Sequence, residues 1–312
     1  MNPAFSVIFF TTSSGAGYGL LTVLGLLNVF GMLPESRMIL LVSMGLAIVL
    51  VTFGLLASTL HLGHPERAWR AFTQWRSSWL SREGVMAVIT YGPAMLFFWG
   101  FWQGEHQQIL YVVAGLVTAI LSLVTVYTTS MIYASLRSIA AWHHGLVPPI
   151  YLLLSVFSGL VLFQLLIAVQ GFLISRLAGF VCLLATLSWL LKILYWRSLD
   201  KAGPQNDAGV ATGLGPRGSV SQLLEPHSSD NYLLKEMGFR IAQKHATKLR
   251  QIARLLLFVL PFAASAGVSL QWVQSFPLFE SFAVLCLVPG LIVERWLFFA
   301  EARHAVVSYY GR

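Results

Sequence analysis

The chain has 312 residues, of which 57% are hydrophobic and only 10% are charged. Together with a positive mean hydropathy, this composition excludes an ordinary soluble domain and indicates a protein that crosses a membrane several times. The formal net charge of +8 would suit a nucleic-acid-binding protein, but the basic face is also a membrane face, which argues against that partner.

Apolar runs long enough to cross a bilayer, about 20 residues each, occur eight times along the chain. We therefore predict an all-α integral membrane protein: a single membrane domain, residues 1–312, in which eight transmembrane helices form a bundle. The first run lacks a basic leader and a cleavage site, which favours a retained span over a signal peptide. The predicted spans are Ser13–Leu33, Met38–Leu60, Glu83–Phe101, Ile109–Tyr133, Pro148–Val169, Leu177–Trp196, Ile252–Leu270 and Leu278–Phe299.

The basic residues predict the orientation of this bundle. With eight spans, both termini share one side with the loops between spans 2 and 3, 4 and 5, and 6 and 7. Of the 20 Lys and Arg residues, only Arg37 and Arg176 fall on the other side. Because cytoplasmic segments are enriched in Lys and Arg, we expect both termini and these three loops to be cytoplasmic.

The longest connection, residues 197–250, is predicted to be a cytoplasmic loop. Its first part is rich in Gly, Pro and Ser and looks extended. From about 231 to 250 the spacing becomes helical, with Leu233, Leu234 and Met237 on one side and lysines around the rest. This amphipathic helix would lie on the lipid surface or serve as a docking platform for a soluble subunit.

Within span 1, Gly15 and Gly19 form a G-x-x-x-G pattern, which predicts close approach of a neighbouring helix. Three prolines, Pro93, Pro261 and Pro289, fall inside predicted spans, where kinks are tolerated.

Titratable and aromatic side chains concentrate in the loop between spans 2 and 3, "STLHLGHPERAWRAFTQWRSSWLSREG". His61 follows span 2 directly, and Glu83 opens span 3 behind Ser81 as a plausible cap. If these spans pair antiparallel, the imidazole and the carboxylate lie close together. Such a pair can accept the protons that a quinol releases with its electrons. A slot open to lipid could be lined by Trp69, Trp75 and Trp79.

Simpler interpretations of these residues stay open. Glu83 would be favoured at the first turn of a helix by the macrodipole alone, and His61 could satisfy an interfacial carbonyl. His64 completes an H-x-x-H pattern, which is weak evidence for a metal without further ligands. Positive-inside charge alone would account for the arginines Arg67, Arg70, Arg76 and Arg82.

The central turns of the spans lack ionisable residues, which disfavours an ion pump or secondary transporter. The charges that touch spans are near span ends: Glu83, Lys192, Glu294 and Arg295. Chemistry is therefore expected at the cytoplasmic edge of the bundle.

We expect no electron carrier inside this chain. Cys182 and Cys286 are isolated in different spans, whereas an iron–sulfur cluster requires four thiolates. None of the eight histidines is in the middle of a span. One b-type haem at the cytoplasmic edge, held by His64 with His143 or His144, is the alternative.

Several segments in order carry a family resemblance. They are "HLGHPERAWRA" after span 2, the acid that opens span 3, "IYASLRSIAAWHHGLVPPIYLLLS", and "NYLLKEMGFRIAQKHATKLR" before span 7. Together with the eight spans, they resemble the DmsC family, the membrane anchor subunits of dimethyl sulfoxide reductase, over nearly the whole chain.

The resemblance implies a complex of three subunits in the bacterial cytoplasmic (inner) membrane. Its partners would be a catalytic subunit with a bis-molybdopterin guanine dinucleotide cofactor and a four-cluster iron–sulfur subunit, both on the cytoplasmic side. The anchor itself would be haem-free and exchange electrons with a quinone, ubiquinone or menaquinone. The quinol-site histidine and glutamate of the family match His61 and Glu83, and His64, Arg67 and Arg70 are their neighbours here.

The family also includes anchors of sulfite dehydrogenases, and the extended loop with "LEPHSSDNYLLKEMGFR" looks more like that branch. The leading expectation is therefore cytoplasmic sulfite oxidation coupled to quinone reduction. The alternative is a dimethyl sulfoxide reductase anchor that oxidises quinol. A purely structural tether without a quinone site is the alternative of another class.

Overall fold

The computed structural model describes residues 4–60, 64–172, 175–201, 220, 240–272 and 276–302. Every regular element within these ranges is helical, and eight helical segments are long and apolar enough to cross a membrane. The predicted all-α bundle of eight spans is thereby confirmed. The spans are α1 (Phe5–Val29), α2 (Arg37–Thr59), α3 (Trp79–Gln103), α4 (Ile109–Ala134), α5 (Val147–Val169), α6 (Ser175–Lys201), a segment comprising α9 (Arg240–Arg254), η3 (Leu255–Val259) and α10 (Leu260–Ser269), and α11 (Phe276–Ala300).

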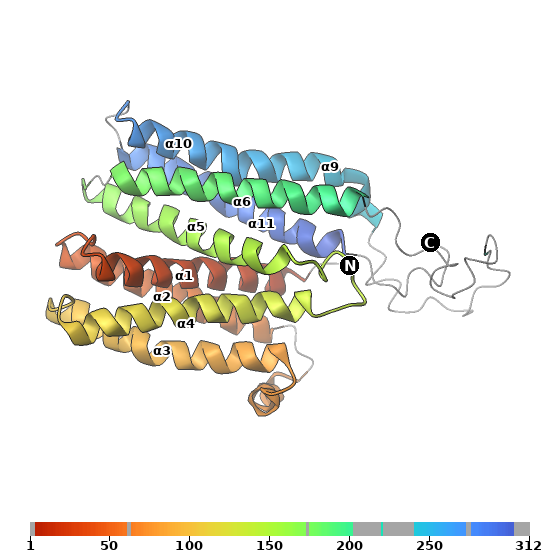
Figure 1. Ribbon diagram of the computed structural model, residues 1–312, viewed down its shortest axis with the longest axis horizontal. Helices are drawn as coiled ribbons and strands as arrows, with labels where there is room; N and C mark the ends of the chain where they lie inside the picture. Colours follow the sequence, from red (N-terminus) through yellow and green to blue (C-terminus); the bar gives the residue numbers. More distant parts are fainter. Residues whose placement is uncertain are drawn as a thin grey trace.

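The helices lie side by side along one common axis (Figure 1). Helices α1, α3 and α5 start at the same end of the bundle at which α2, α4, α6 and α11 finish. A short 3₁₀ helix, η1 (Pro65–Gln74), lies at this end, next to the start of α3. We call it the η1 end.

The first span differs from its predicted bounds. Helix α1 starts at Phe5 rather than at Ser13, and it ends at Val29 rather than at Leu33. Three of the four hydroxyls in the polar run 11–14 donate hydrogen bonds to carbonyls one turn earlier in the same helix. Because the helix itself satisfies these hydroxyls, the polar run does not interrupt it.

Helix α1 forms the centre of one half of the bundle, where it packs against α2, α4 and α5. Gly19 and Gly159 let α1 and α5 approach closely, because a Cβ on either residue would overlap backbone atoms of the other helix. Gly15, its predicted partner in the G-x-x-x-G pattern, has open space instead, although its carbonyl accepts a 2.6 Å hydrogen bond from Ser155. Small residues therefore determine the packing distance, but only one of the two predicted glycines contributes to it.

The seventh span continues helix α9 without a break. Helix α9 is followed by the π-helical turn η3 and then by α10, which contains Pro261 in its first turn. The predicted amphipathic helix of about residues 231–250 is helical from Arg240 onward. Its earlier part, 231–239, lies outside the described residues.

Candidate functional site

Glu83 is buried inside the bundle at the η1 end, with 4% of its surface exposed. Helix α3 begins at Trp79 with Ser78 at its N-cap, and its first turn contains no acidic residue. The expectation that Glu83 opens the helix behind Ser81 is therefore wrong, because the helix starts earlier. A carboxylate that is buried a turn deeper needs a partner of its own, beyond the helix macrodipole.

That partner is the hydroxyl of Thr129 on α4, which donates a hydrogen bond to Oε1 of Glu83. Among the residues that the structure describes, no basic side chain forms an ion pair with Glu83. Glu83 is thus a buried carboxylate with a neutral donor, an arrangement that is typical of groups that exchange protons.

His61, the predicted partner of Glu83, lies outside the described residues, since α2 and its C-cap are described only as far as Leu60. Their proximity stays a prediction. Helix α2 packs mainly on α1 and α3 mainly on α4, and α2 and α3 contact each other less.

A small apolar cavity of about 10 Å³ marks the place where α1, α2 and α3 meet. We call it the α2–α3 cavity. The hydroxyl of Tyr18 is buried and has no hydrogen-bond partner among the described residues, and that of Tyr91 bonds to Thr52 at 2.7 Å. The cavity is lined by Tyr18, Leu21, Ile48, Val51, Thr90, Tyr91 and Ala94.

Helix η1 covers the start of α3: a Cβ added at Gly84 would lie 3.3 Å from the ring of Phe72. Its polar groups face outward. His64 Nδ1 lies 2.9 Å from a carboxylate oxygen of Glu66, and Arg67 lies 3.9 Å from the same oxygen, all on exposed side chains. His64 and Arg67 therefore belong to the connection that packs on α3, but neither side chain contacts Glu83.

Arginines stack on tryptophans along this connection. Each guanidinium lies between 4.2 and 5.7 Å from a ring centre, in the pairs Arg70 with Trp69, Arg76 with Trp75 and Arg82 with Trp79. Amphipathic rings with charged groups over them suit the polar surface of a membrane. Arg70 faces Trp69 and, like Arg67, has no contact with Glu83.

The histidines named as alternative haem ligands make local hydrogen bonds. His143 Nδ1 donates to the carbonyl of Ala134 at 2.7 Å. His144 Nδ1 accepts the N–H of Leu146 at 3.1 Å, so Nε2 carries the hydrogen and donates to Ser198 at 2.9 Å. Partial burial lowers the pKa of His144. Both of its ring nitrogens are engaged within the protein.

The sequence matches the family of the DMSO reductase anchor subunit (DmsC) over residues 1–300. The chain belongs to the DmsC family. It is also 34% identical to one subunit of the sulfite dehydrogenase of Allochromatium vinosum, in an alignment that covers 99% of both chains. The resemblance seen in the sequence is confirmed.

Beyond Glu83, this DmsC-family anchor contains charged residues whose pairing the sequence did not reveal. Lys192 of α6 forms an ion pair with Glu294 of α11, next to Arg295, and all three are buried. Glu280, near the opposite end of α11, is also buried, and neither of its carboxylate oxygens has a hydrogen-bond partner among the described residues. An acid inside an apolar run was the signal that could have identified Glu280.

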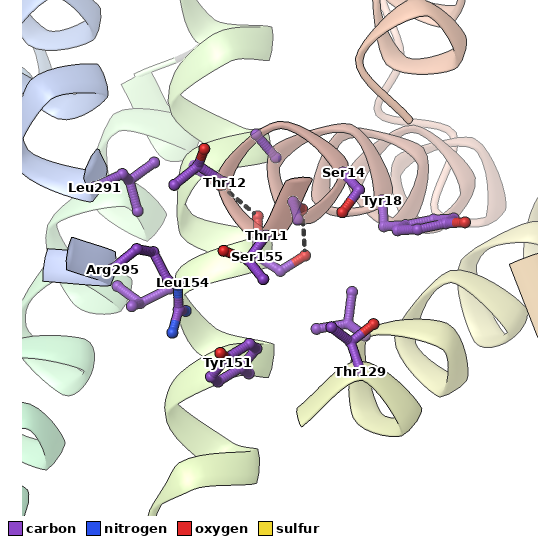
Figure 2. A pocket seen from close by; sticks show the side chains of 14 residues that line it. Thr11, Thr12, Ser14, Tyr18, Thr129, Tyr151, Leu154, Ser155, Leu291 and Arg295 are labelled. Atoms are coloured by element: carbon purple, nitrogen blue, oxygen red, sulfur yellow. Dashed lines mark hydrogen bonds between the residues drawn. The ribbon is translucent and has the colours of Figure 1, made fainter. Parts of the chain in front are cut away.

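A second cavity, of about 20 Å³, lies between α1, α4, α5 and α11 (Figure 2). We call it the hydroxyl cavity, because most of its lining side chains end in a hydroxyl group. Thr129, which donates its hydrogen bond to Glu83, is one of its lining residues. Its polar lining residues are Thr11, Thr12, Ser14, Tyr18, Thr129, Tyr151, Ser155, Ser158 and Arg295.

Proposed function

We propose that this chain is the membrane anchor and quinone-reactive subunit of a three-subunit molybdenum and iron–sulfur oxidoreductase. Membership of the DmsC family supports the anchor role. The observation that carries the quinone role is Glu83, a buried carboxylate near the start of α3 that has no cation within ion-pair distance among the described residues.

The redox centres belong to the partner subunits in this proposal. Cys182 on α6 and Cys286 on α11 cannot supply the four thiolates of a cluster. No group of three His, Cys, Asp or Glu residues in the described ranges is arranged to hold a metal ion. Electrons would then pass between the quinone and the nearest cluster of the iron–sulfur subunit, docked at the η1 end.

Glu83 would exchange protons with the quinone. Reduction of a quinone consumes two electrons and two protons, and a carboxylate that alternates between ionised and neutral forms can deliver those protons one at a time. We propose that His61 completes the site. The α2–α3 cavity is too small for a quinone ring, so the ring would enter by separating α2 from α3, which pack less on each other than on α1 and α4, respectively.

Sulfite is the substrate class that we favour for the complex, because the Allochromatium vinosum relative belongs to a sulfite dehydrogenase. Oxidation of sulfite with one water gives sulfate, two protons and the two electrons that reduce the quinone. A dimethyl sulfoxide reductase would run electrons the other way, from quinol to the sulfoxide. Co-purification of the partners, followed by assays with sulfite and with dimethyl sulfoxide, separates the two.

We propose that the η1 end faces the cytoplasm of a bacterium. It carries the arginines of η1 and of the α4–α5 loop, whereas Arg37 and Arg176 lie toward the other end. A phosphatase or fluorescent reporter fused to the C-terminus tests this orientation: a periplasmic C-terminus contradicts it.

The variant Glu83→Gln tests the quinone role. It keeps the shape and the bond from Thr129 but cannot accept a proton, so the ratio of quinone-coupled to dye-coupled turnover should fall by about tenfold or more. Glu105→Gln, at the opposite end, is the matched control and should leave that ratio unchanged. A normal ratio in Glu83→Gln would favour a purely structural tether. An absorption spectrum of the intact complex tests the haem alternative.

A further inference from the structure

A cluster of three ionisable side chains is buried inside the bundle, toward the η1 end. Lys192 forms an ion pair with Glu294, and Arg295 Nε lies 3.5 Å from the second carboxylate oxygen of Glu294. The three side chains are at most 4% exposed. Two cations face one anion, so the cluster carries one positive charge that nothing inside it balances. The nearest further acid, Glu301, is already paired with Arg250 at 2.8 Å. Because an unbalanced buried charge is costly, another buried anion is expected to balance the cluster.

The hydroxyl cavity extends from Arg295 to Thr129 (Figure 2). Arg295 Nη1 and the hydroxyl of Tyr151 are buried and have no hydrogen-bond partner among the described residues. The guanidinium carbon lies 3.7 Å from the ring centre of Tyr151, which holds Arg295 in place. A polar cavity of about 20 Å³ has room for at least one water molecule, so water can link Arg295 to Thr129.

Thr129 joins this cavity to Glu83. Its hydroxyl donates to the carboxylate, and its side chain also lines the cavity. Glu83 is a buried anion without a cation within ion-pair distance, and Arg295 belongs to a buried cluster with a cation in excess. One small polar cavity lies between them.

We propose that Arg295 is the counter-charge of Glu83 and acts through the hydroxyl cavity as a positioning residue for proton exchange. The inference rests on the proposed quinone role of Glu83. With Glu83 ionised, the four buried groups are neutral together. When Glu83 takes a proton from water, one positive charge is left, which favours passing the proton on to an oxygen of the reduced quinone. Arg295 keeps its own protons throughout.

The other groups that face Glu83 do not supply this charge. The ionised groups of η1 are exposed to solvent, and Arg82, the neighbour of Glu83 on α3, donates to two backbone oxygens of the connection that follows η1. His61 lies outside the described residues. Three phenols within electrostatic range of Glu83 are neutral near pH 7 because a phenol ionises at about pH 10: Tyr18 on α1, Tyr133 on α4 and Tyr151 on α5.

The test uses the purified complex with Arg295→Gln, Arg295→Lys and the double variant Glu294→Gln/Arg295→Gln. The readout is the pH profile of quinone-coupled turnover, normalised to dye-coupled turnover at each pH. Loss of the cation should move the acid limb of the profile to higher pH by about one unit. Lysine at 295 should keep the limb near its wild-type position. The double variant should move it back, because Lys192 then carries the excess positive charge.

If Arg295 had only a structural role, the double variant Glu294→Gln/Arg295→Gln would lose more quinone-coupled turnover than Arg295→Gln does. That order, or an unmoved limb in Arg295→Gln, overturns the proposal. Infrared titration measures the protonation of the Glu83 carboxyl directly, in the band that Glu83→Gln removes. It compares the wild-type complex with the Arg295 variants without using a quinone. It therefore separates a failure of the Arg295 inference from a failure of the quinone role.

Discussion

The hydrogen bond from Thr129 to Glu83 offers a sharp test of the site, because valine removes the hydroxyl of Thr129 at nearly constant volume. A hydrogen bond to a charged group contributes about 1.5–3 kcal/mol, and Glu83 is 4% exposed, so bulk solvent does not replace the lost donor. With about 1.4 kcal/mol for each factor of ten, Thr129→Val should lower the quinone-coupled kcat/KM about ten- to hundredfold.

Thr128→Val is the matched control. Thr128 is a buried neighbour on the same helix, but its hydroxyl donates to the carbonyl of Thr125 and not to Glu83. Steady-state kinetics with a soluble quinone analogue, normalised to dye-coupled turnover, should show a change of less than about twofold for this variant. Equal losses in both variants, or no loss in Thr129→Val, would refute the role of the hydrogen bond.

Three further predictions concern stability. Lys192→Met should destabilise the protein by about 1.5–3 kcal/mol, because Glu294 loses the closer of its two cationic partners and keeps only Arg295, at 3.5 Å. An unchanged thermal midpoint in this variant contradicts the prediction. Gly19→Ala should abolish the folded peak in size-exclusion chromatography, because its Cβ would overlap the backbone of α5. Gly15→Ala should keep that peak, because nothing lies within 4 Å of the added Cβ. Equal elution profiles for the two variants would count against the packing argument. Burial lowers the pKa of His144, so the unfolded chain binds the proton at a higher pH than the folded protein does, and stability should fall as the pH drops below about 6.5. In His144→Asn the thermal midpoint should lose this acid sensitivity. An equal acid sensitivity in the wild-type protein and the variant would be evidence against this role of His144.

The spans were predictable because each is a long apolar run, and the fold follows from eight such runs joined mostly by short loops. The start of α1 was not, since Thr11 and Ser14 look like an interruption until their hydroxyls are seen to bond within the helix. Whether such a hydroxyl finds a carbonyl acceptor in its own helix depends on the folded helix and cannot be read from the residue type.

The site was predictable in part. Glu83 is identifiable from its place between an arginine-rich loop and an apolar run, but its partner Thr129 is 46 residues away, and sequence spacing carries no sign of that contact. The sequence likewise indicates only separate charges near span ends at Lys192, Glu294 and Arg295. Their pairing depends on how distant helices pack, which one sequence does not specify.

The central claim, that a quinone meets this chain beside Glu83, is tested most directly by photochemical crosslinking. The intact complex would be illuminated with a photoreactive quinone analogue, and the modified peptides would be identified by mass spectrometry. Our account predicts adducts at the η1 end, on the last turns of α2 and the first turns of α3. Adducts confined to the opposite end of the bundle, or to the partner subunits, would contradict it.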